Sequence, residues 1–239
     1  MKACFYWVVG SLLVPAVAQA QVGVRVGGNV AGLQELGSRN AFDNTTIPGL
    51  GYQAGVYYKL ALGQHWLVQP EVQFSRESQQ LRKEGYGYDD YYTPTQTFLI
   101  HDYRVSLSFL NVPVLVRRTL GPVYVEAGPQ ASVLVGGRGR GETRQPGGAQ
   151  RYPTREAIDQ AATAYFNRVD AGVCVGVGLR LPAGWGVSLR AYQGLTRLTG
   201  DPHGYQYAPG VLPPSGTEYR RVAQVALTRD LWGPGGALH

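Results

Sequence analysis

Cysteine and histidine are scarce in this chain. Of its 239 residues, only Cys4 and Cys174 carry a thiol. Cys4 precedes an apolar run that we expect to be removed, so the mature chain keeps one thiol and cannot form an internal disulfide. The four histidines, His65, His101, His203 and His239, lie far apart, and neither a Ser-His-Asp arrangement nor a metal-ligand spacing emerges. The sequence therefore gives little support to catalysis or a metal centre, and we predict no cofactor.

Long hydrophobic runs are also missing. After residue 20 no segment has the roughly 20 consecutive apolar residues that a membrane helix needs. The run from Phe5 to Val17 follows Lys2 and leads to Ala18-Gln19-Ala20, which is a small-x-small cleavage site. Gly10 and Pro15 interrupt this run, so we predict a secretory signal peptide over residues 1–20 and not a membrane helix. Its removal takes away Lys2 alone among charged residues and lowers the formal net charge from +6 to +5.

What the sequence does contain is a strict alternation of apolar and polar residues. From Leu50 to Ser75 it predicts two strands that flank a turn at Leu62-Gly63-Gln64-His65. One face of this hairpin is apolar and is edged by Trp66 and tyrosines, and the other carries Lys59, Glu71 and glutamines. Such a pair of faces suits strands with lipid outside and a wet interior.

The alternation continues and predicts eight strands, at about 22–33, 50–60, 66–75, 101–118, 123–133, 169–180, 185–196 and 219–232. The apolar parity changes within the fourth strand, which predicts a bulge near Phe109 to Asn111. Residues 154–165 have the composition of a short helix with Thr154 as its N-cap. Many of the 33 glycines fall inside strands, where small inward residues make room for larger neighbours.

The connections between these strands alternate regularly in length. Short ones lie near Gly63, Gly121 and Ala183, and long ones centre on residues 40, 88, 150 and 208. This is the pattern of an up-and-down barrel with short periplasmic turns and long extracellular loops. We therefore predict an all-β, eight-stranded antiparallel transmembrane β-barrel as one domain over residues 21–232, followed by a tail at 233–239.

Five short motifs resemble those of the PorT-like outer-membrane β-barrels, and the resemblance covers the whole mature chain. They are Gly23–Asn29, Gly51–Gly55, Gln69–Ser75, Leu110–Arg117 and Ala127–Pro129. The resemblance implies an eight-stranded barrel inserted from the periplasm, and it implies little about activity. The chain departs from such proteins at Asn111, where they often carry an acidic residue, and after Trp232, where they often end on an aromatic residue.

Charged residues recur on the face that we expect to point inward. Eight strands leave an interior just wide enough for side chains, so these charges have to pair. We predict a structural ion-pair network, and a proton or ion path is the alternative. Its members are Arg25, Lys59, Glu71, Arg117, Glu126, Asp170, Arg180 and Arg190.

Two further clusters lie in the predicted outer loops. Arginines between residues 136 and 166 could clamp the phosphates of lipopolysaccharide, although a solvated charged loop would have the same composition. These arginines are Arg138, Arg140, Arg144, Arg151 and Arg155. The tyrosines within residues 86–92 suit either a recognition surface or an extension of an aromatic girdle.

We predict a non-enzymatic outer-membrane barrel with a role in surface recognition or adhesion, in envelope integrity or in a secretion assembly. A narrow passive pore is one alternative. Another is an outer-membrane enzyme, for which His101-Asp102 is the best candidate pair, and a soluble periplasmic β-sandwich is the structural alternative. The expected partners are outer-membrane lipid, lipopolysaccharide and an envelope or extracellular protein, and no nucleic acid.

Overall fold

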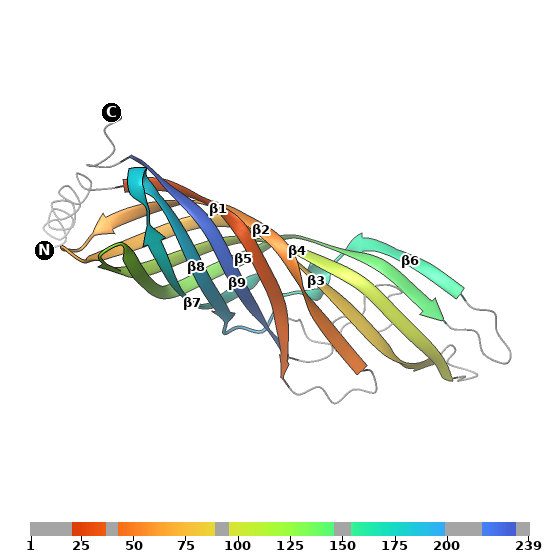
Figure 1. Ribbon diagram of the computed structural model, residues 1–239. Helices are drawn as coiled ribbons and strands as arrows, with labels where there is room; N and C mark the ends of the chain where they lie inside the picture. Colours follow the sequence, from red (N-terminus) through yellow and green to blue (C-terminus); the bar gives the residue numbers. More distant parts are fainter. Residues whose placement is uncertain (1–20, 37–42, 89–95, 146–153, 199–216, 233–239) are drawn as a thin grey trace, which may run out of the picture.

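The computed structural model describes residues 21–36, 43–88, 96–145, 154–198 and 217–232 (Figure 1). The predicted signal peptide and the C-terminal tail lie outside these residues. Within these ranges the helical segments are η1 (Thr163–Tyr165) and η2 (Pro182–Gly184), each a single 3-10 turn. Among the described residues no helix has the length and hydropathy to cross a membrane. The strands are β1 (Gln21–Leu36), β2 (Asp43–Ala61), β3 (Trp66–Tyr88), β4 (Gln96–Leu120), β5 (Val123–Gln145), β6 (Thr154–Ala161), β7 (Val169–Arg180), β8 (Trp185–Gly194) and β9 (Thr217–Trp232).

Eight of these strands close into a ring in which all neighbours are antiparallel. The order is β1-β2-β3-β4-β5-β7-β8-β9, and β9 pairs with β1 from Trp232 opposite Val22 to Thr217 opposite Leu36. The predicted eight-stranded antiparallel barrel is confirmed. The remaining strand, β6, lies outside the ring and pairs with β5.

Short connections gather at one end of the ring, which we call the turn end. They are Leu62–His65, Gly121–Pro122 and Leu181–Gly184. Gly121 has a φ of 65°, a conformation that is cheap for glycine because it lacks a Cβ. At the opposite end, which we call the loop end, the strands are joined through residues 37–42, 89–95, 146–153 and 199–216, and these lie outside the described part of the chain.

The outer surface of the ring is lined by exposed aliphatic side chains. Val175, for example, is 53% exposed although both neighbouring strands flank it. Every strand of the ring exposes a valine in this way, as the alternation predicts. The outside of the ring therefore suits hydrocarbon and not water. These valines are Val26, Val56, Val72, Val114, Val125, Val175, Val187 and Val225.

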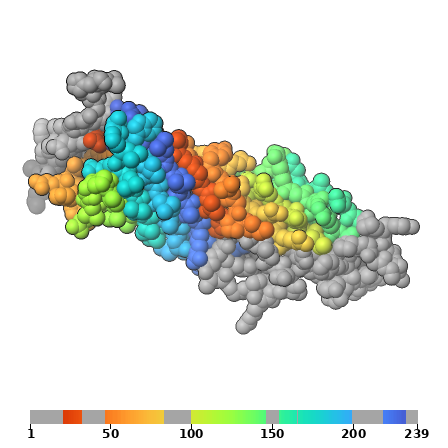
Figure 2. All heavy atoms as spheres, viewed as in Figure 1, coloured from red at the N-terminus to blue at the C-terminus, as the bar shows by residue number. Residues whose placement is uncertain are grey.

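The ring is much taller on one side. Strands β3, β4 and β5 have 23, 25 and 23 residues, whereas β7 and β8 have 12 and 10. β5 pairs with β7 up to Val133, and from Arg138 onward it pairs with β6 instead. The change of partner coincides with a bulge, because Ser108 pairs with Gly136 while Phe109 pairs with Leu134, which leaves Val135 unpaired on β5. Figures 1 and 2 show β3 to β6, yellow to green, continuing past the ends of β7 to β9.

We call the part of β3 to β6 that lies beyond the ends of β7 and β8 the extended wall. The predicted helix over 154–165 is wrong, because most of these residues belong to this wall. Residues Thr154–Ala161 form β6, and only Thr163–Tyr165 are helical. Beyond Val133 the backbone of β5 has lost β7 as a partner, and pairing with β6 satisfies its free N–H and C=O groups. Tertiary pairing therefore overrides the local helix propensity. The predicted loops at 34–47, 78–97 and 136–166 are shorter than expected for the same reason, because the strands continue into them.

A bulge is present at the predicted place, between Ser108 and Phe109, but its extra residue, Val135, belongs to β5 and not to β4. Tyr103, Val105, Leu107 and Phe109 are buried on the same inward parity as Asn111. The phase of β4 is constant, and the environment changes instead. Near the turn end the inside is polar and the outside apolar, whereas at the loop end an apolar cluster fills the inside. That cluster consists of Leu81, Tyr103, Val105, Leu107, Phe109, Leu134, Ile158, Ala162, Phe166 and Leu198.

Placing a charge on the outer valine band should destabilise the barrel. We expect Val175→Arg to lower the free energy of unfolding by about 2–4 kcal/mol, because an arginine would face hydrocarbon near the middle of the band. Ala157→Arg is the matched control, since Ala157 is exposed on β6 opposite Glu142. Urea unfolding of both variants in lipid vesicles would measure this, and an equal cost for the two would contradict it.

Candidate functional site

Six of the eight predicted interior residues are buried in the lumen of the ring: Arg25, Glu71, Arg117, Glu126, Asp170 and Arg190. Lys59 is partly buried at the turn end. Arg180 is exposed and does not join the others. It is the last residue of β7, and its guanidinium reaches across the turn end to donate to the Gly121 carbonyl oxygen at 2.6 Å.

Glu71 on β3 is the centre of the lumen network. Its Oε2 accepts hydrogen bonds from Arg25 Nη1 at 3.1 Å and Arg190 Nη1 at 2.7 Å. Its Oε1 accepts from Arg190 Nη2 at 2.6 Å and from the Gln69 amide. β3 and β8 stand four places apart in the ring of eight, so the bidentate pair between Glu71 and Arg190 spans the full width of the barrel.

Glu126 on β5 extends the same network toward the turn end. It accepts from Arg117 Nε and Nη2 at 3.1 and 2.8 Å, and from Arg190 Nε. The Arg117 guanidinium also lies 3.7 Å from the centre of the Tyr124 ring. Gly178 lies under that ring, because an added Cβ would come within 2.3 Å of it. The expectation that small inward residues make room for large ones is confirmed here.

A second charged layer lies nearer the loop end, and of its charged members the sequence analysis predicted only Asp170. Arg220 on β9 donates to Glu77 at 2.8 and 2.5 Å and to Asp170 at 3.2 Å. It also donates to Asn111 Oδ1 at 3.1 Å. Strand parity could have revealed Glu77 and Arg220. Glu77 has the same inward parity as Glu71 on β3, and Arg220 has the same inward parity as Gln224 on β9.

A further ion pair lies at the turn end, where the Lys59 ammonium is 2.6 Å from an Asp230 carboxylate oxygen. The Tyr57 hydroxyl donates a hydrogen bond to the same carboxylate at 2.7 Å. Among the described residues, the ion pairs inside the barrel thus join five cations to five carboxylates. Beside Arg220 the lumen leaves a hollow of about 10 Å³, roughly the minimum volume for one water molecule. The interior is packed with paired charges.

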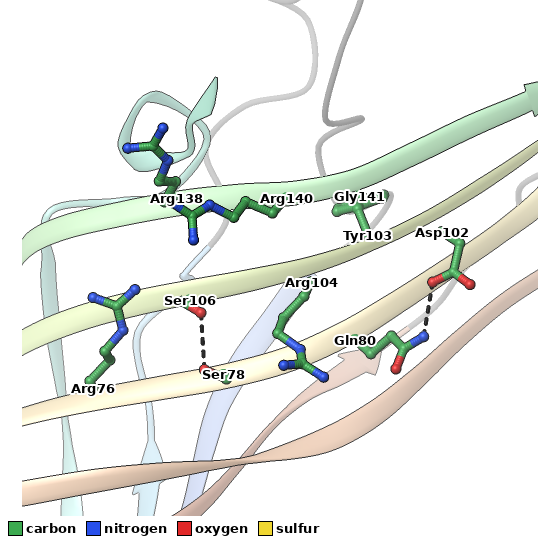
Figure 3. A pocket seen from close by; sticks show the side chains of 10 residues that line it. All are labelled: Arg76, Ser78, Gln80, Asp102, Tyr103, Arg104, Ser106, Arg138, Arg140 and Gly141. Carbon is green, nitrogen blue, oxygen red and sulfur yellow. Dashed lines mark hydrogen bonds between the residues drawn. The ribbon is translucent and has the colours of Figure 1, made fainter. Parts of the chain in front are cut away.

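The second site lies on the outer face of the extended wall (Figure 3). A hollow of about 560 Å³ there is bordered by Arg76, Arg104, Arg138 and Arg140, which we call the arginine face. Asp159 on β6 accepts from Arg138 at 2.5 Å and from Arg140 at 3.3 Å. The hydrogen bond from Arg138 is the main cause that lowers the pKa of Asp159 below its usual range, so this carboxylate stays ionised.

The predicted lipopolysaccharide contacts divide into two groups. Arg138 and Arg140 belong to the arginine face. Arg144 and Arg155 lie farther along the wall, where both pair with Glu142. Arg151 lies outside the described residues, as do the side chains of the predicted tyrosine cluster at 86–92. Sequence reasoning missed Arg76 and Arg104, because the alternation within one strand does not show which outward residues of neighbouring strands meet.

The His101-Asp102 pair does not form a catalytic dyad. Consecutive residues of a strand point to opposite faces. His101 is buried on the inner face, where its Nδ1 lies 2.9 Å from Thr143 Oγ1, whereas Asp102 lies on the outer face and accepts from Gln80 at 2.9 Å. Among the described residues, no group of three His, Cys, Asp or Glu side chains could hold a metal ion.

Comparison with known proteins bears on the fold. A family model described as "Outer membrane protein beta-barrel domain" matches residues 17–200. Neisserial surface protein A (NspA) is similar in structure, with 9% identity, a TM-score of 0.44 and coverage of 89% of this chain and 99% of that one. Ail of Yersinia pestis, solved with the heparin analogue sucrose octasulfate, has 7% identity and a TM-score of 0.41, with coverage of 89% of this chain and 99% of that one. OprG from Pseudomonas aeruginosa has 10% identity and a TM-score of 0.39, with coverage of 90% of this chain and 96% of that one. No curated protein sequence matches the chain.

Removing a carboxylate from the lumen should destabilise the barrel strongly. We expect Glu71→Ala to lower the free energy of unfolding by about 3–5 kcal/mol, because Arg25 and Arg190 would stay buried without their partner. Asp159→Asn is the control, since it breaks an exposed pair and should leave the melting temperature unchanged. Thermal unfolding in detergent measures both effects. An unchanged curve for Glu71→Ala and Glu126→Ala would overturn this account of the lumen.

Proposed function

The chain belongs to the outer membrane protein beta-barrel domain family, and from this premise we propose that it is a closed, non-enzymatic barrel that holds a recognition or adhesion surface outside the cell. The short turns of outer-membrane barrels face the periplasm and the longer connections face outward. The loop end, with its extended wall, is accordingly the outer end. The single observation that carries the proposal is that an extended wall projects at the loop end of a barrel whose lumen is filled by side chains.

The filled lumen argues against the passive pore. The pair between Glu71 and Arg190 crosses the centre, the Arg220 layer lies above it, and the apolar cluster around Phe109 covers both. An ion would have to break these pairs in a low-dielectric interior, which costs several kcal/mol for each charge left alone. The proposal of a closed barrel rests on that cost.

The extended wall supports the recognition role. β4 from Gln96 to Phe109 is a strand segment of roughly 45 Å at about 3.3 Å per residue. β3 pairs with it throughout and β5 from Ile100 onward, and the inward side chains from Tyr103 to Phe109 belong to the apolar cluster. Rigid sheets present contact groups without an entropic cost of ordering them on binding. An extracellular protein or glycan is the partner that we propose for this wall.

The finer assignments are proposals of the same kind. The motifs Gly51–Gly55 and Gln69–Ser75 support a place among the PorT-like members of the family. Roles in envelope integrity or in a secretion assembly stay as predictions. The opposite orientation of His101 and Asp102 supports the non-enzymatic assignment.

Electrical recording tests the closed lumen. We expect the protein, reconstituted in planar bilayers, to show no discrete conductance steps, because the ion pairs and the apolar cluster fill the ring. A general porin serves as the positive control for insertion and recording. Reproducible unitary steps from the intact protein would reject the closed barrel and favour the pore.

Excision of the β5–β6 hairpin tests the recognition surface. The Ala162 N–H already donates to the Gly137 carbonyl oxygen at 3.0 Å, so residues 138–161 can be replaced by an Asn-Gly turn that keeps both ends in place. We expect cells that display this variant to lose at least about tenfold in attachment to host cells or matrix, at equal surface level. Equal attachment, or loss matched by an unfolded barrel in heat-modifiability gels, would count against the proposal.

A further inference from the structure

Arginines are stacked across strands on the outer side of the wall, directly above the apolar band. On β3, β4 and β5, outward residues form rows, in which Ser78 pairs with Ser106 and Ser106 with Arg138. In the next row Arg104 stands directly opposite Arg140. Like charges opposite one another destabilise a sheet. The arrangement therefore calls for an anion between them.

The acidic residues of the wall only partly neutralise these arginines. Arg138 and Arg140 share a single carboxylate, Asp159. Arg76 and Arg104 have no carboxylate partner among the residues that the structure describes. Asp102 lines the hollow, and Asp159 is the partner of Arg138 and Arg140. The four guanidiniums and these two carboxylates together leave a net charge of +2 around the hollow.

Hydroxyl groups complete the lining of the hollow. The Ser78 and Ser106 hydroxyls lie 3.0 Å apart between Arg76 and the other arginines (Figure 3). One hydroxyl of such a pair keeps its proton free for another acceptor. Planar guanidiniums bind phosphate oxygens in bidentate fashion, and hydroxyl donors supply the remaining contacts. The chemistry of the hollow thus fits a phosphate group.

The position of the hollow selects the kind of phosphate. One row toward the turn end, the outward residues are apolar: Phe74 on β3, Leu110 on β4, and Val133 and Val135 on β5, all exposed. Phe74 and Arg76 are two residues apart on the same outward face. A ligand that filled both regions would carry a phosphorylated headgroup with acyl chains below it, as the lipid of the outer leaflet does.

We propose that the arginine face, with Ser78 and Ser106, binds a phosphate of lipid A, the membrane anchor of lipopolysaccharide, while its acyl chains lie on Phe74, Leu110 and Val135. The proposal rests on the outward orientation of the loop end and not on the adhesive role. The site differs from the predicted clamp, because it includes Arg76 and Arg104, whereas Arg144 and Arg155 pair with Glu142 farther along the wall.

Native mass spectrometry of the detergent-solubilised protein with bisphosphorylated lipid A tests the site. We expect the Arg76→Gln, Arg104→Gln double variant to raise the apparent Kd about 10- to 100-fold, as two charge-assisted contacts are lost. The Arg144→Gln, Arg155→Gln double variant removes the same charge from the same wall and should bind as the unaltered protein does. Arg104→Lys keeps the charge without the bidentate fork, so its affinity should be intermediate. Heat-modifiability gels verify that each barrel is folded.

Two further probes separate the sources of phosphate. Dephosphorylated lipid A should not be retained, and millimolar inorganic phosphate should not displace bound lipid A. Equal losses in the two double variants, retention of the dephosphorylated lipid, or full displacement by inorganic phosphate would each overturn the proposal. Attachment of the hairpin-excised cells is a separate readout, so failure of the adhesive role would not affect this result.

Discussion

Every charge inside the lumen must be paired, because eight strands enclose a space that side chains fill. This requirement explains the choice of arginine for the central cations, since one guanidinium can satisfy two carboxylates at once. Arg190 does so with Glu71 and Glu126, and Arg220 does so with Glu77 and Asp170. It also explains how Asn111 fits at a position where the resemblance to PorT-like barrels implies an acidic residue. Arg220 already holds two carboxylates there, and the amide oxygen adds an acceptor without a third negative charge.

The same strands serve two solvents. Along β4, residues 111–116 expose valines outside the ring and bury Asn111 and Leu115 inside. Residues 102–106 present polar groups outside and bury Tyr103 and Val105. The inversion marks the height at which hydrocarbon gives way to water and headgroups. Below it the outside is apolar by necessity, and above it the wall needs an apolar interior of its own to stay folded. The bulge at Val135 and the exchange of β7 for β6 lie at this same height.

Much of the fold could be predicted from the sequence, because a strand with lipid on one side repeats apolar residues every second position. The valines of β7 identify that strand without ambiguity. The wall could not be predicted in this way, since β3 beyond Phe74 has Leu81 as its one aliphatic residue and shows no apolar alternation. Residues 154–161 read as a helix because the partner that makes them a strand is remote along the chain. The inward charges could be predicted from the alternation within the predicted strands. Glu77 lies beyond the predicted end of its strand and Arg220 close to the predicted start of the last one, and both were overlooked. Arg76 and Arg104 were overlooked because a site that spans three strands has no signature in any one of them.

The bond between Glu71 and Arg190 lies along a diameter of the ring, and those from Arg220 to Glu77 and Asn111 cross it at another level. The partners in these pairs lie three or four places apart in the ring, so a flat, open sheet would hold them far from one another. The buried pairs therefore depend on the closed ring, and opening the seam between β9 and β1 would separate several of them together.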